Sequence, residues 1–131
     1  IIPIFLSAKP LSQSLQKRND TPCSAGCICG NTHRCNIKNF VYHISCNLCV
    51  DEYVGETFRT YRTRLNEHRT KPTSSVRRHF LHKHLILPTF DNMTHKILKT
   101  GFQNTLHRKH FEQSKINEIQ PNINIQYPKI R

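Results

Sequence analysis

Glycine, acidic residues and long apolar runs are all scarce in this chain of 131 residues. The four glycines are scattered, so there is no glycine-rich phosphate-binding loop, and hydrolysis of nucleoside triphosphates has no support. No run of about 20 apolar residues occurs, so we expect neither a transmembrane helix nor a membrane partner. The apolar run at residues 1–6 follows no basic region and is too short for the core of a signal peptide.

Hydrophobic residues are few as well, at 36% of the chain. A chain of this length can form one modest core, so we expect a single domain of about 90 residues with irregular flanks. We place this domain at residues 38–125, after a proline-containing polar linker at 1–37 and before a tail at 126–131. Because the chain begins with Ile rather than Met, we expect it to be a piece of a longer protein.

Basic residues are abundant and spread along the predicted domain. Twenty Lys and Arg against eight Asp and Glu give a formal net charge of +12. The positive residues gather at 59–69, 71–83 and 96–109. A polyanion such as nucleic acid is therefore the expected partner. The alternative is a basic face that is only solvated, because ribosomal and membrane-binding proteins can be equally basic.

Local patterns predict a small α+β domain with a three-stranded antiparallel sheet flanked by helices. Residues 39–45 alternate and are rich in aromatic and β-branched side chains, so they predict a strand that pairs with a second strand at 51–56. A third strand is expected at 85–90, near a sheet edge because Pro88 cannot donate a backbone hydrogen bond.

Three helices are expected in addition. The first contains Phe58, Tyr61 and Leu65 at helical spacing and ends before Pro72. The second starts at a cap formed by Ser74 or Ser75 and stops near His84. The last runs from a cap at Thr105 to Ile119, where Pro121 stops it, and its inward residues are expected to be Phe111, Ile116 and Ile119.

Two cysteines in the loop between the first two strands, Cys46 and Cys49, have the Cys-x2-Cys spacing of a zinc knuckle. His79 and His84 would complete four tetrahedral ligands, although His82 also fits the permitted spacing and competes with either of them. Such a closed site would tie the hairpin to the second helix and would support a lean core.

A second cluster of cysteines lies in the predicted linker, with His33 nearby. Its spacing is irregular and contains a Cys-x-Cys step, so a second zinc site and a functionally silent linker both stay open. Cysteine pairs interleaved with nine histidines favour metal ligation over the remote alternative of a secreted disulfide scaffold. The members of this cluster are Cys23, Cys27, Cys29 and Cys35.

Two short motifs, Phe40-Val41-Tyr42 and Tyr53-Val54-Gly55, stand ten residues apart and are followed by Arg64 and His68. Glu112 and a terminal Pro-x-x-Asn that ends in Asn124 lie further along the chain. This order resembles the GIY-YIG nuclease family, in which two strands carry the tyrosines and the next helix carries the arginine. The first triplet departs from the family, because Phe and Val replace its Gly and Ile.

The resemblance implies a role for each matched residue. Arg64 would hold the scissile phosphate through its planar guanidinium. Tyr42 would act as the general base, while Tyr53 and His68 would orient water and phosphate by hydrogen bonds. Glu112 would bind Mg²⁺ or Mn²⁺, since such an ion needs only one or two protein carboxylates. Gly55 and Asn124 would support the site.

The position of the zinc knuckle between the tyrosine strands is similar to that in the nucleases of Penelope-like retroelements. This similarity implies a nuclear, Mg²⁺-dependent DNA endonuclease that contacts the phosphate backbone and nicks DNA to prime insertion, linked to an upstream reverse transcriptase. The alternative is a zinc-stabilised module that binds DNA or RNA without cutting it.

Overall fold

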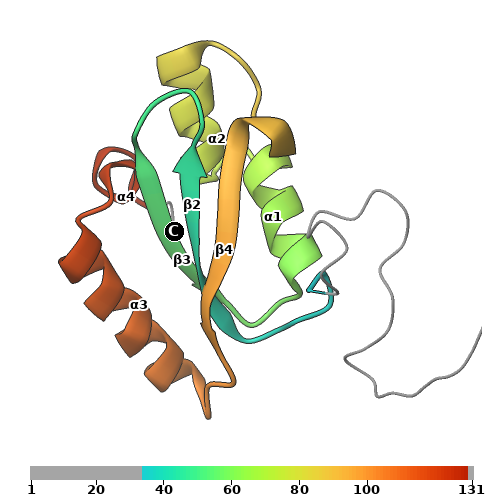
Figure 1. Ribbon diagram of the computed structural model, residues 1–131, viewed down its shortest axis with the longest axis vertical. Helices are drawn as coiled ribbons and strands as arrows, with labels where there is room; N and C mark the ends of the chain where they lie inside the picture. Colours follow the sequence, from blue (N-terminus) through green and yellow to red (C-terminus); the bar gives the residue numbers. More distant parts are fainter. Residues whose placement is uncertain (1–33, 130–131) are drawn as a thin grey trace, which may run out of the picture.

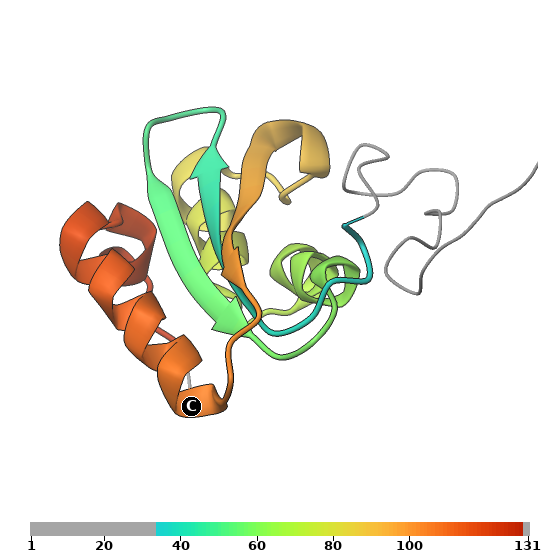
Figure 2. The same ribbon diagram turned by 60° about the horizontal axis from the view of Figure 1, so that its bottom comes forward.

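The computed structural model describes residues 34–129, which form a three-stranded antiparallel sheet with helices on both sides (Figure 1). The strand order is β3-β2-β4, with β2 at Phe40–Cys46, β3 at Glu52–Thr57 and β4 at Met93–Thr100. Helices α1 and α2 cover one face, and α3 lies across the opposite face beside β3 (Figure 2). The predicted α+β class with a three-stranded antiparallel sheet is confirmed.

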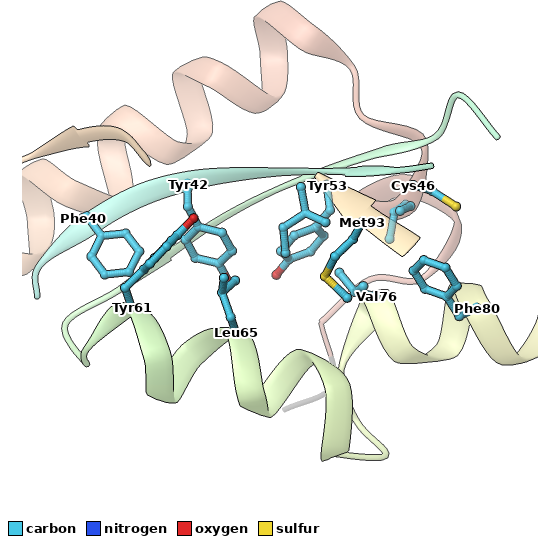
Figure 3. Packing of buried hydrophobic residues seen from close by; sticks show 11 residues of the cluster. Phe40, Tyr42, Cys46, Tyr53, Tyr61, Leu65, Val76, Phe80 and Met93 are labelled. Atoms are coloured by element: carbon cyan, nitrogen blue, oxygen red, sulfur yellow. The ribbon is translucent and has the colours of Figure 1, made fainter. Parts of the chain in front are cut away.

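The β2–β3 hairpin contributes the largest share of the core. Its register pairs Tyr42 with Gly55 and Ile44 with Tyr53, so these residues share one face of the sheet. Phe40 lies on the same face, and the side chains of Phe40, Tyr42 and Tyr53 point toward the helices on that side (Figure 3). Both predicted strands are confirmed, because the alternation of large apolar and smaller residues matches a sheet that is covered by helices.

Helix α1 spans Tyr61–Thr70, and its N-cap is Thr60, whose side chain accepts a hydrogen bond from the Thr63 amide. Tyr61 and Leu65 are buried against the sheet. The prediction that Phe58 begins this helix is wrong. Phe58 lies before the cap and is 67% exposed, so its helical spacing to Tyr61 was coincidental.

Helix α2 spans Ser75–His79, and Ser74 is its cap. It continues without a break into a π-helical turn, η2, at Phe80–His84, and ends where Leu85 adopts left-handed φ. The predicted end near His84 is confirmed. A π-turn is wider than an α-turn, and such turns are frequent at functional sites.

The third strand was predicted at 85–90, and this prediction is wrong. That segment is irregular, it leads into the short 3₁₀ helix η3 at Phe90–Asn92, and Leu85 is 83% exposed. The third strand is β4. Its Thr, His and Lys residues are polar, so the hydropathy of the sequence does not indicate a strand there. A strand of an antiparallel sheet can be polar where a face of the sheet meets solvent, and after Met93 the residues of β4 are exposed or only partly buried.

Helix α3 spans Thr105–Ile119, and its N-cap is Asn104 rather than the predicted Thr105. The residues it buries are Arg108 and Glu112, whereas Phe111, Ile116 and Ile119 are only partly buried, contrary to expectation. The reason is electrostatic: α3 packs on β3 through an ion pair between Arg108 and Glu56. A polar contact of this kind has no hydropathy signature.

Pro121 follows α3 as predicted, but it also precedes a short helix that was not predicted, α4 at Asn122–Gln126. Cys35 is buried and Ile37 packs on the core, although both precede the predicted boundary at residue 38. Arg78 donates hydrogen bonds to the carbonyls of Tyr127 and Pro128, which lie in the predicted tail. None of the helices among residues 34–129 has the length and apolar character needed to span a membrane.

Candidate active site and metal centre

A chain of short hydrogen bonds joins Arg64, Tyr42 and His68 in the space between the sheet and α1. Arg64 Nε donates to the Tyr42 hydroxyl over 2.9 Å, and that hydroxyl lies 2.6 Å from His68 Nε2. On the far side of the imidazole, Nδ1 lies 2.8 Å from Ser74 Oγ. Arg64 can only donate, so the Tyr42 hydroxyl accepts from it. In the tautomer of His68 with Nε2 as the acceptor, Tyr42 donates its proton to Nε2 and His68 donates from Nδ1 to Ser74.

Protonation states in this chain follow from burial. Burial, reinforced by the neighbouring Tyr53, raises the pKa of Tyr42 well above its ordinary value, although Arg64 opposes the shift. Burial and the charge of Arg64 lower the pKa of His68 well below its usual value. Burial disfavours the charged form of Arg64, but the two tyrosines outweigh it and raise its pKa. At neutral pH, Tyr42 and His68 are therefore neutral and Arg64 is charged.

Tyr53 and Gly55 complete this group from β3. The Tyr53 ring lies 5.0 Å from the His68 ring and 6.1 Å from the Tyr42 ring, measured between centroids. A Cβ atom at Gly55 would lie 2.5 Å from the Tyr42 hydroxyl and 2.8 Å from the Tyr53 ring. Such distances are far below van der Waals contact, so both tyrosines can keep their positions only above a glycine.

Two members of this group, Tyr53 and Arg64, border a cleft between β3 and the turn that joins α1 to α2, whereas Tyr42 and His68 are buried. Arg64 also bonds Glu67 at 3.1 Å, so one side of its guanidinium is fixed within the protein. The residues around the cleft are mostly polar or basic and include the guanidinium of Arg64 and the edge of Tyr53. They are Tyr53, Arg64, Glu67, Lys71, Ser74 and Lys129.

Glu112 lies on α3, next to this cleft, and is 7% exposed. Its Oε2 atom lies 2.8 Å from Lys129 Nζ. Lys129 lines both the Tyr53 cleft and a second hollow around Glu112, so the lysine stands between the carboxylate and the tyrosine. Burial opposes the charge on Lys129, but Tyr53 and Glu112 outweigh it and raise its pKa.

The structure thus brings Tyr42, Tyr53, Arg64 and His68 together, and Glu112 adjoins them through Lys129. Sequence reasoning missed Lys129 altogether, because it was assigned to the tail and no local pattern marks it. Its contact becomes visible only once the segment after α4 folds back.

Asn124 has a structural position, as the resemblance implied. Its side-chain Oδ1 accepts from the Val54 amide, and its Nδ2 donates to the Val54 carbonyl, both over 2.8 Å. One amide side chain therefore satisfies both backbone groups of a residue between Tyr53 and Gly55. This contact holds α4 against the outer edge of β3.

Cys46, Cys49, His79 and His84 gather at the other end of the sheet, with their four candidate ligand atoms all within 4.8 Å of one another. Cys46 Sγ lies 3.4 Å from His84 Nε2, and Cys49 Sγ lies 3.6 Å from His79 Nε2. Zinc bonds of about 2.0–2.3 Å in a tetrahedron place ligand atoms about 3.6 Å apart. The cluster could therefore hold a metal ion such as zinc with little rearrangement.

The competing ligand, His82, is not part of this cluster. Its ring packs against Tyr127, 5.8 Å between centroids. The spacing could not decide between His79, His82 and His84, because the π-helical turn changes which residues share a face. In a π-turn the interval between residues on one face is longer than in an α-helix.

A buried carboxylate supports the cluster from outside. Asp51 is 4% exposed, and its Oδ2 lies 3.7 Å from His79 Nδ1, a buried nitrogen without a hydrogen-bond partner. Burial alone would raise the pKa of Asp51, but hydrogen bonds from Lys83 and Asn122 outweigh it and lower the pKa. Metal-bound histidines commonly direct their second nitrogen at such a carboxylate. Sequence reasoning missed Asp51, although its position two residues after Cys49 was visible.

Three members of the second cysteine cluster, Cys23, Cys27 and Cys29, lie outside the described residues, as does His33. The fourth, Cys35, is buried in the domain. The second zinc site therefore stays a prediction.

No protein-family model, curated protein or solved structure matches this chain. The site is accordingly interpreted from its own geometry and from the residues that the sequence singled out.

Proposed function

We propose that the protein is a magnesium-dependent DNA endonuclease that hydrolyses phosphodiester bonds. The observation that carries this proposal is the hydrogen-bonded chain from Arg64 through Tyr42 to His68, packed against Tyr53 and Gly55. A structural tyrosine needs one hydrogen-bond partner. Tyr42 instead lies between a permanent cation and a neutral imidazole, which is an arrangement suited to proton transfer.

The proposed chemistry uses the Tyr42 hydroxyl, His68 Nε2 and the Arg64 guanidinium. Tyr42 is fully buried, so the attacking water would have to enter from the cleft at Tyr53 and Arg64. Tyr42 would then take a proton from this water while it passes its own proton to His68 Nε2. The guanidinium of Arg64 stabilises the negative charge that develops on the Tyr42 oxygen, which offsets the raised pKa of the phenol. The remaining Arg64 donors face the cleft, where they would bind the scissile phosphate.

Glu112 is the candidate magnesium ligand. Its carboxylate is nearly buried beside basic residues, and one carboxylate suffices where substrate phosphate supplies further oxygen ligands. A magnesium ion held there would supply charge relief at the scissile phosphate. Lys129 neutralises the carboxylate in its absence, so the lysine would have to give way or move to the phosphate.

The cysteine and histidine cluster is proposed to hold zinc as a structural ion. Its ligands come from the β2–β3 loop and from the α2–η2 segment. A bound ion would connect the end of the tyrosine hairpin to the element that follows Ser74, the hydrogen-bond partner of His68. It would thereby keep the proposed catalytic residues in register.

DNA is the proposed substrate because of charge. A hollow beside Arg64 is bordered by five cations and two carboxylates, Glu56 and Glu67, with which the cations are paired. The excess of cations over carboxylates could serve contacts with backbone phosphates on either side of the cut. The retroelement context, the upstream reverse transcriptase and nuclear localisation depend on the sequence resemblance alone. The cations around this hollow are Arg59, Arg64, Lys71, Arg108 and Lys109.

The second candidate is a zinc-stabilised module that binds nucleic acid without cutting it. The ion pair between Lys129 and Glu112 favours this alternative, because it satisfies the only carboxylate proposed as a magnesium ligand. Salt-sensitive binding without magnesium-dependent products would support it.

Nicking of supercoiled plasmid by zinc-replete protein, with and without Mg²⁺, distinguishes the two candidates. We expect Tyr42→Phe and Glu112→Gln to lower the rate by about 100-fold or more. Two variants serve as matched controls. Tyr61→Phe removes a tyrosine hydroxyl that bonds His95 rather than His68. Glu118→Gln changes an exposed carboxylate on α3, the helix that carries Glu112. Cleavage that survives in both catalytic variants would overturn the proposal.

A further inference from the structure

A hollow of about 590 Å³ lies between the end of β4 and the outer side of α3. It does not include Glu112 or any residue of the tyrosine cleft. Its lining combines two phenylalanines with cationic and polar side chains, and no acidic residue belongs to it. Prominent among the lining residues are Lys99, Phe102, Gln103, His107, Phe111 and Ser114.

Phe102 and Phe111 pack against each other, and the ammonium group of a lysine lies near both rings. Their ring centroids are 5.5 Å apart, with the planes tilted by 56°. The ammonium group of Lys99 lies 5.5 Å from the centre of the Phe102 ring and 5.3 Å from that of Phe111. Lys115 approaches the Phe111 ring to 5.6 Å. Both rings are only partly buried, so aromatic surface borders the hollow.

The residues that α3 buries explain why the Phe111 ring is only partly buried. The helix turns Arg108 and Glu112 toward the sheet, and this leaves Phe111 on its outer side. A protein that used α3 only for packing would gain more by burying the phenylalanine and exposing the charges. The reversed arrangement points to a ligand for the outer side.

We propose that this hollow binds single-stranded nucleic acid, with an unstacked base against Phe102 and Phe111 and a backbone phosphate at Lys99. Lys115 lies outside the lining and is paired with Glu118. Aromatic rings flanked by cations form the usual platform for single strands, because every base has a face that can stack. Gln103 and Ser114 can hydrogen-bond to base edges. Intact duplex is a poor ligand, since its bases are already stacked inside. The inference does not depend on the proposed cleavage.

Fluorescence anisotropy of labelled oligonucleotides tests the proposal with the full, zinc-replete chain in the absence of Mg²⁺. Three probes of equal charge per strand are compared: a single strand, the same strand with several abasic positions, and the corresponding duplex. We expect Phe102→Leu and Phe111→Leu each to weaken binding of the base-bearing strand by about fivefold. Neither should change binding of the abasic strand or the duplex by more than about twofold, because phosphate contacts do not use the rings.

Lys99→Gln is expected to weaken binding of the single strand and of the abasic strand to the same extent. It should also reduce the slope of log K against log salt concentration by about 1, the value for one lost phosphate contact. Leu106→Ala is the matched control for the phenylalanine variants, because Leu106 is exposed on α3 and does not line the hollow. Thermal melting and zinc content show whether each variant folds. Equal binding of the base-bearing and abasic strands, or phenylalanine variants that bind like the unaltered protein, would overturn the proposal and leave an acidic peptide as the ligand to test.

Discussion

Lys129 and Glu112 form an ion pair, with Nζ 2.8 Å from Oε2, at the point where the segment after α4 returns to α3. The lysine also borders the cleft that contains Tyr53 and Arg64. The pair therefore places a cation where a magnesium ion or a substrate phosphate would have to come. It connects a residue from the end of the described chain with the carboxylate most important for the proposed chemistry.

Replacing Lys129 by Gln should lower the Mg²⁺ concentration for half-maximal plasmid nicking by about two- to fivefold, the range expected for a partly exposed ion pair. The reason is that the lysine competes with the metal for Glu112. Lys96→Gln is the control, because Lys96 is exposed on β4 and lines neither the cleft nor the hollow around Glu112. An increased requirement for Mg²⁺ in Lys129→Gln would show that the lysine assists the site instead of competing for it.

Gly55→Ala should destabilise the domain by about 1–3 kcal/mol, as overpacking of a filled interior does. The added methyl group would lie 2.5 Å from the hydroxyl of Tyr42, so the tyrosine must move away from Arg64 and His68. Urea unfolding measures the loss. Gly101→Ala provides a contrast, because a Cβ there meets no atom within 4 Å and introduces only the strain of positive φ. If Gly55→Ala is no less stable than the parent chain, the packing described for the two tyrosines is incorrect.

His84→Gln should remove one equivalent of zinc and lower the melting temperature, because binding of a structural ion contributes directly to folding. His82→Gln should leave the zinc content unchanged, since His82 packs on Tyr127 outside the cluster. Metal content by mass spectrometry and thermal unfolding check both variants. Equal zinc loss in the two variants would contradict the assignment of ligands.

Acid should destabilise the protein partly through His68. Its pKa is lowered in the folded state, so below the ordinary histidine value of about 6.5 the unfolded chain binds the extra proton. The contribution is complete above that pH and is lost as the pH falls toward the folded pKa. The slope from one histidine is at most about 1.4 kcal/mol per pH unit.

His68→Gln should accordingly flatten the dependence of unfolding free energy on pH just below 6.5, measured with excess zinc. His107→Gln, exposed on α3, should leave the dependence as it is. A steep dependence that persists in His68→Gln would mean that another group is responsible.

The sequence predicted the hairpin and the first two helices well, because their signals are local. Tyr42 and Tyr53 stand in strands with clear alternation, and Ser74 is a good cap. The two cysteine ligands were also predictable from their Cys-x2-Cys spacing, whereas the spacing of the histidines also admitted His82. These features need only short stretches of chain to be recognised.

The rest depended on contacts between distant segments. The residues of strand β4 after Met93 are exposed or only partly buried, so hydropathy favoured the apolar residues just before the strand. Helix α3 binds the sheet through charges, which reversed its expected inner and outer sides. Asp51 and Lys129 acquire their partners only through the tertiary fold, and no spacing rule relates either one to its site.

The hydrogen bonds of Asn124 also affect the outer edge of the sheet. Strand β3 is an outer strand of the sheet, and free amide and carbonyl groups on such a strand can recruit another chain. By bonding both backbone groups of Val54, the side chain of Asn124 occupies the place that a neighbouring strand would take. The same contact that supports the tyrosines thus shields this part of the β3 edge from pairing with another strand.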